Sequence, residues 1–71
     1  MNFNYSKLRG RIREVFGSEL RFCDQMPFNR STLSQKLNGV TEFSQSEMLT
    51  AMKLLDIPTS KCDEYFFAVK S

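Results

Sequence analysis

The stretch that decides the fold is residues 22–39, FCDQMPFNRSTLSQKLNG. Its first residues continue a helix, which Pro27 stops because the residue before a proline resists the α conformation. Asn29 then suits the N-cap of a second helix, and this helix runs to Asn38, where Gly39 suits its C-terminus. The stretch therefore predicts two helices joined by a short connection.

The second of these helices has a thin apolar stripe. Leu33 and Leu37 are its apolar residues, and at about 100° per residue they fall on one line along the helix. Lys36 is expected on a flank of this stripe. Polar side chains occupy the opposite side, namely Ser31, Ser34, Gln35 and Asn38. Such a helix is held by tertiary packing, and its polar side must face water or a partner.

Helical patterns also lie on both sides of this stretch. The first expected helix has one apolar face, made of Leu8, Ile12, Val15 and Phe16. Ser44 and Glu47 predict a capping box at the start of a later helix. In the C-terminal tail we expect Phe66 to point inward. The sequence does not decide whether Phe67 is buried or exposed. The sequence thus predicts an all-α fold with a single domain over residues 1–71 and helices at about 7–16, 18–26, 30–38, 45–55 and 61–65.

Composition excludes several classes of function. The 71 residues include no histidine, which excludes Ser-His-Asp and Cys-His catalysis within one chain, and Cys23 and Cys62 are too few for a zinc site. No glycine-rich phosphate-binding motif occurs, and no apolar run approaches the roughly 20 residues that cross a bilayer. We expect a binding protein with no catalytic residue, metal, cofactor, small-molecule substrate or membrane partner. Its cysteines are expected to be buried thiols in a reducing cytosol, with a Cys23–Cys62 disulfide as the alternative.

Basic charge is concentrated in the first half of the chain. Residues 1–40 carry seven Lys and Arg against three Asp and Glu, a net charge of +4, whereas residues 41–71 carry three against five, a net charge of −2. A basic region is typical of a nucleic-acid-binding face, and an ordinary solvated surface is the alternative. Lys7 and Arg11 lie beside the apolar face of the first helix, where they are expected to follow phosphates.

The stretch over residues 22–39, with its ending Leu37-Asn38-Gly39, resembles the helix-turn-helix of phage Cro- and CI-type repressors. The order of elements over residues 5–66 resembles their compact five-helix, lambda-repressor-like fold. More narrowly, the chain is similar to small Cro-like proteins of Gram-positive temperate phages, one branch of which, the modulators of repression, binds the CI-type repressor itself.

This resemblance implies a transcription regulator of the lysis–lysogeny switch in the cytoplasm of a bacterial host. It would act as a Cro-like repressor that places a recognition helix in the major groove of DNA. The alternative is a modulator of repression, or antirepressor, that binds a CI-type repressor through the same helix-turn-helix face. A structural adaptor with no DNA role is a third possibility.

By this resemblance the base-reading positions are Arg30, Ser31, Ser34 and Gln35. Asn38 matches a phosphate-contacting position, and Lys36 and Thr41 are expected near phosphate. The implied partners are a double-stranded DNA operator, a CI-type repressor and a second copy of the chain in a homodimer. Two residues depart from the family pattern: Pro27 stands where a turn glycine is usual, and Glu19 where a neutral amide often meets phosphate.

Overall fold

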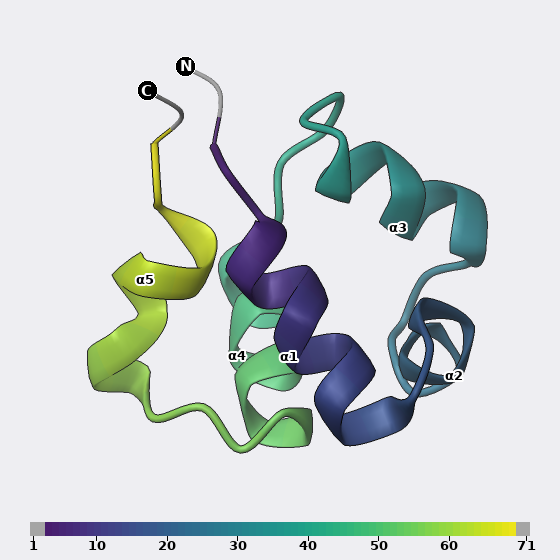
Figure 1. Ribbon diagram of the computed structural model, residues 1–71. Coiled ribbons are helices and arrows are strands. Elements are labelled where there is room, and N and C mark those ends of the chain that lie inside the picture. Colours follow the sequence, from purple (N-terminus) through teal and green to yellow (C-terminus); the bar gives the residue numbers. More distant parts are fainter. Residues whose placement is uncertain (1–2, 70–71) are drawn as a thin grey trace.

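The computed structural model describes residues 3–69 and consists of helices joined by short connections. The helices are α1 (Ser6–Phe16), α2 (Glu19–Cys23), α3 (Arg30–Leu37), α4 (Gln45–Leu54) and α5 (Cys62–Phe66), with a 3-10 turn, η1, at Thr59–Lys61. An isolated antiparallel bridge joins Phe3 to Val69. Figure 1 shows α1 crossing the middle of the molecule, with α5 on one side and α2 and α3 on the other. The predicted all-α fold with five helices is confirmed.

Three of the helices begin at side-chain caps. The side chains of Ser18, Asn29 and Ser44 each accept a hydrogen bond from an amide in the first turn of α2, α3 and α4, respectively. The Ser44 amide also donates to the Glu47 carboxylate at 2.8 Å, which completes the predicted capping box. These bonds satisfy amides that the start of a helix otherwise leaves without partners.

α2 is shorter than predicted. It ends at Cys23 because the amides of Gln25 and Met26 bind carbonyls three residues back, which tightens the chain into turns before Pro27. The Cys23 thiol is buried and donates to the Phe28 carbonyl, with 3.3 Å between sulfur and oxygen. Burial raises the pKa of this thiol, which keeps it a neutral donor. The last residue of α2 therefore helps to hold the connection that leads into α3.

The core receives side chains from all five helices, and each cysteine within it is a free thiol. The largest fully buried side chains are Phe22, Phe66, Leu8, Ile12, Leu33 and Leu55. Phe66 points inward as predicted and meets Phe43 edge-on, with ring centroids 5.3 Å apart. Cys23 and Cys62 are not bonded to each other, so the disulfide alternative is wrong; Cys23 is buried as predicted, whereas Cys62 is only half-buried. Within residues 3–69, no helix has the length and apolarity that crossing a membrane requires.

The last turn of α1 shows how α2 folds back on it. Gly17 closes the helix with φ +84°, a left-handed conformation that suits glycine because it has no Cβ. The ring of Phe16 then meets that of Phe22 on α2, with centroids 5.6 Å apart. Val15, predicted on the buried face, is instead 43% exposed, because α2 covers the Phe16 side of this turn.

The two glycines of this region predict opposite responses to alanine. An added Cβ meets nothing within 4 Å at either Gly10 or Gly17, so the backbone alone decides the outcome. Gly10 lies inside α1, where alanine should raise the free energy of unfolding by roughly 0.5–1 kcal/mol. At Gly17 the positive φ should make alanine lower it by about 1 kcal/mol. Urea unfolding of Gly10→Ala and Gly17→Ala measures both, and shifts of the same sign would contradict the assignment of the α1 end.

Candidate functional site

Four exposed side chains on the outer side of α3 form a surface that we call the α3 face. These residues are Arg30, Ser31, Ser34 and Gln35. Leu33 and Leu37 are buried on the side opposite Ser31 and Gln35, as their spacing predicts, and Arg30 lies in the first turn of the helix. Among residues 3–69 nothing forms an ion pair with Arg30. The α3 face therefore presents one guanidinium, two hydroxyls and one amide to solvent.

Asn38 caps the C-terminal end of α3 and is engaged within the chain. Its Oδ1 accepts a hydrogen bond from Arg9 Nη2 at 3.0 Å, and its Nδ2 donates to Ser34 Oγ at 3.3 Å. Arg9 also pairs with Glu19, with 3.2 Å between Nη1 and Oε2. One guanidinium thus joins α1 to the first turn of α2 and to the end of α3. It also faces the Glu19 carboxylate, the charge that departs from the family pattern.

The loop after α3 adds an apolar side chain beside the α3 face. The amides of Val40 and Thr41 both donate to the Gln35 carbonyl, at 2.8 and 3.4 Å, and so fold the loop back on the helix end. Thr41 is exposed, and Val40 is 71% exposed. Sequence reasoning missed Val40; the available signal was an apolar residue directly after Gly39 and outside any helical pattern.

Lys36 lies beside the leucine stripe, as its position in the sequence predicts, but its side chain lies inside the molecule and not near an open surface where phosphate could reach it. Its side chain is buried, and its Nζ lies 2.9 Å from Glu47 Oε1 and donates to the Glu42 carbonyl at 2.9 Å. The rings of Phe28 and Phe43 lie 5.5 and 5.7 Å from the same nitrogen. A desolvated ammonium requires such partners. Lys36 is therefore not free to meet phosphate or a partner's carboxylate.

Lys7 and Arg11 are also bound within the chain, away from the α3 face. Lys7 Nζ pairs with Glu64 Oε2 of α5 at 2.7 Å. Arg11 donates from Nε to the Leu55 carbonyl at the end of α4, at 2.9 Å, and pairs with Glu14 through Nη1. These contacts direct both side chains towards α5 and the end of α4. The structure does not bring them together with the predicted base-reading residues.

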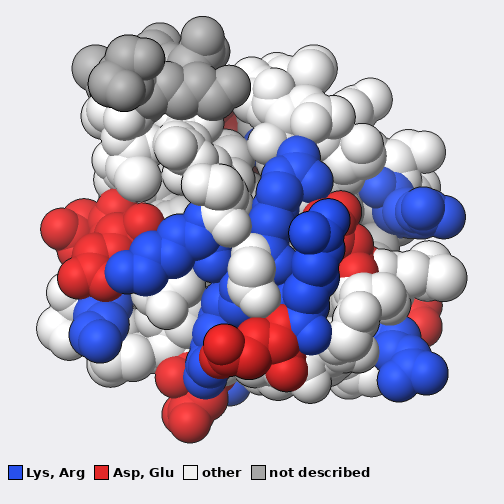
Figure 2. Space-filling view, viewed as in Figure 1, with Lys and Arg blue, Asp and Glu red and all other residues white. Residues whose placement is uncertain are grey.

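The basic first half of the sequence does not form a uniform basic surface. Figure 2 shows acidic side chains among the Lys and Arg side chains over α1. Within the described residues, the Lys and Arg side chains that form no ion pair are Arg21, Arg30, Lys53 and Lys61. Two of them, Arg21 and Arg30, belong to α2 and α3. Most of the cations of the first half therefore face a carboxylate of the same chain, although the side chains of Lys7 and Arg13 stay largely exposed.

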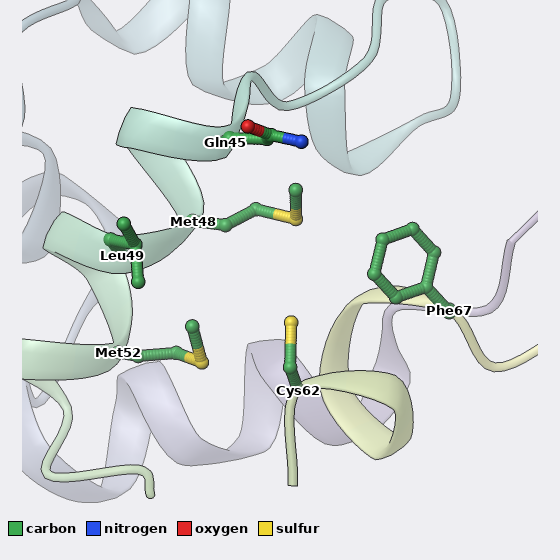
Figure 3. A pocket seen from close by; sticks show the side chains of 6 residues that line it. All are labelled: Gln45, Met48, Leu49, Met52, Cys62 and Phe67. Atoms are coloured by element: carbon green, nitrogen blue, oxygen red, sulfur yellow. The ribbon is translucent and has the colours of Figure 1, made fainter. Parts of the chain in front are cut away.

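A groove of about 320 Å³ lies between α4 and the C-terminal segment. It is lined by Gln45, Met48, Leu49, Met52, Cys62 and Phe67. Figure 3 shows Met48 and Met52 of α4 facing Cys62 and Phe67 across this space. None of these six lining residues is charged, and none is a predicted site residue. It is an apolar surface separate from the α3 face.

Glu47 predicts that stability depends on pH in acid. Burial raises the pKa of its carboxyl, but hydrogen bonds from the Ser44 amide and the Lys36 ammonium outweigh burial, and the pKa lies below the ordinary 4.5. A carboxyl with a lowered pKa stabilises the fold above its unfolded pKa, and this stabilisation is lost as the pH falls through the folded pKa. Urea unfolding of the wild type and Glu47→Gln should show their difference shrinking as acid is added. A difference that stays constant with pH would contradict this.

Comparisons with known proteins place the five-helix fold in a family and match it to a solved structure. The chain is a member of the family described as protein of unknown function DUF739, whose model matches residues 1–69. Among solved structures, it is similar to the solution structure of the modulator of repression of the temperate bacteriophage TP901-1 from Lactococcus lactis. The two are 33% identical with a TM-score of 0.81, over 94% of this chain and 90% of that chain. No curated protein matches the chain significantly.

This similarity confirms the resemblance to the modulator-of-repression branch and supports a regulatory role in a phage. Identity of this size over nearly the whole of both chains reflects common ancestry as well as a shared fold. The relation to DNA-binding Cro proteins stays a prediction, as does contact with an operator.

Proposed function

We propose that this protein is a non-enzymatic phage regulator that acts as a modulator of repression in the cytoplasm of a bacterial host. It binds a CI-type repressor protein through the α3 face. Homology to the TP901-1 modulator of repression supports this reading. One observation favours it over a Cro-like repressor: of the cations predicted to meet phosphate or lie along it, Lys36 is buried and paired with Glu47, and Arg11 donates to the Leu55 carbonyl.

The physical reason lies in how proteins bind DNA. Each phosphate that a Lys or Arg neutralises releases counterions, and this release supplies much of the affinity. The α3 face has one cation, Arg30, and α2 adds Arg21. Its hydroxyl and amide groups, its single guanidinium and the exposed Val40 suit an interface with a protein, where arginine and apolar side chains are favoured at the centre.

The second candidate is a helix-turn-helix repressor that binds an operator directly. It is favoured by the outward position of Arg30 and Gln35, since arginine pairs bidentately with guanine and glutamine with adenine. One such helix covers few base pairs, so a specific site requires a homodimer with half-sites about one turn of DNA apart. The same side chains thus serve either reading, and binding experiments separate them.

A charge reversal at Arg30 tests the proposed partner. Arg30→Glu should weaken binding to the CI-type repressor from the same phage genome by roughly 10- to 100-fold, measured by titration calorimetry. Lys61→Glu makes the same change of charge at another exposed residue without an ion pair, on η1, and should leave the affinity unchanged. Equal losses in the two variants, or no complex with the wild type, would contradict the proposal.

The DNA candidate is tested in parallel with a fragment that carries the phage operator region. We expect the protein alone to leave this fragment unshifted in a gel, and to change the shift that the repressor produces. Direct operator binding that weakens steeply with salt, and that Gln35→Ala relaxes in base preference, would instead support the Cro-like repressor.

A further inference from the structure

Lys36 is a buried cation that the proposed interface does not contact. It is the one buried charged residue among the described residues, with 7% of its surface exposed. Burying an ammonium is unfavourable unless it is paired and hydrogen-bonded. Methionine, which has similar length and no charge, would fill such a space without that penalty. The presence of a lysine here therefore calls for a role that apolar packing does not supply.

The contacts of Lys36 join α3 to the start of α4. Its Nζ lies 2.9 Å from Glu47 Oε1 and donates to the Glu42 carbonyl, also at 2.9 Å. Phe28, just before α3, and Phe43, just before α4, place their rings 5.5 and 5.7 Å from the nitrogen. These are directional contacts, so they are satisfied by one arrangement of α3 relative to α4.

α3 needs such contacts because its apolar stripe is narrow. Two leucines in line resist separation from the core more than they resist rolling of the helix about its own axis. At about 100° per residue, Lys36 lies about 60° to one side of Leu33, and Asn38 about 100° to the other side of Leu37. Lys36 is tied to α4, and Asn38 is tied to Arg9 of α1. The helix is therefore held on both sides of its stripe.

Glu47 gives this link a fixed reference. The Oε1 atom that meets Lys36 also accepts a hydrogen bond from the Ser44 amide, at 2.8 Å. That bond belongs to the capping box, so the first turn of α4 determines where the carboxylate lies. The rotation of α3 about its axis is thus set relative to the cap of α4.

We infer that Lys36 and Glu47 are positioning residues, which hold α3 at the rotation that presents the α3 face to its partner. This inference rests on the proposed function, because it concerns the same surface. Neither side chain belongs to the α3 face. Their loss should change how Arg30, Ser31, Ser34 and Gln35 are presented, and should reduce partner affinity although all four residues are intact.

Residual dipolar couplings of the free, full-length protein test the orientation directly. In Lys36→Met, couplings of the α1, α4 and α5 amides should still fit the wild-type structure, whereas those of α3 should not. Affinity for the CI-type repressor should fall by about tenfold under conditions where the variant is fully folded. A purely stabilising residue would lower the unfolding free energy without moving the α3 couplings.

Two further variants complete the test. Glu47→Gln keeps an acceptor for the Ser44 amide and removes the charge, so it should disturb α3 in the same way and carries the test if Lys36→Met does not fold. Glu64→Gln removes the surface pair with Lys7 and should leave α3 unchanged. Couplings of α3 that fit the wild-type structure in both Lys36→Met and Glu47→Gln would overturn the inference. A wild type that fails to bind the repressor would contradict the proposed function, while the couplings still decide the role of Lys36.

Discussion

Leu33 and Leu37 are the two buried apolar side chains through which α3 enters the core, and the arrangement around α3 follows from that narrow contact. A broader apolar face would hold the helix by burial alone, but it would leave less of the helix free for another molecule. The chain instead combines two leucines with polar links on either side. Lys36 reaches α4, Asn38 meets Arg9 of α1, and the outer side stays open to solvent.

Contacts between helices also determine how the charges of the chain are distributed. The first half of the sequence is basic, yet several of its cations hold helices together. Arg9 connects α1 to α2 and α3, Arg11 binds the end of α4, and Lys7 pairs with α5. The net charge of a stretch of sequence indicates the charge available to a ligand only when its Lys and Arg side chains are not engaged in contacts within the protein. Among the described residues of this half, only Arg21 and Arg30 form no ion pair, and only Arg30 belongs to the α3 face.

Local patterns were sufficient to predict much of the fold. The Ser44–Glu47 capping box and the Asn29 cap depend on neighbouring residues, and each is formed as expected. The two-leucine stripe and the exposed Ser31 and Gln35 follow from helical period alone.

Features that depend on contacts between distant elements could not be predicted from the sequence. The end of a lysine side chain can lie several ångströms from its Cα, so helical period could not indicate that Lys36 reaches Glu47. Val15 is exposed because of the path that α2 takes. The groove between Met48 and Phe67 exists because two segments far apart in the sequence meet there. Each of these outcomes is set by tertiary packing, which a local pattern does not encode.

The most direct measurement is a titration of the isotope-labelled protein with the CI-type repressor, followed through backbone amide resonances. If the outer side of α3 is the contact surface, the largest changes will fall on Arg30, Ser31, Ser34 and Gln35, with smaller changes at Val40. Changes centred on Met48, Met52 and Phe67, or no change at saturating repressor, would contradict the account.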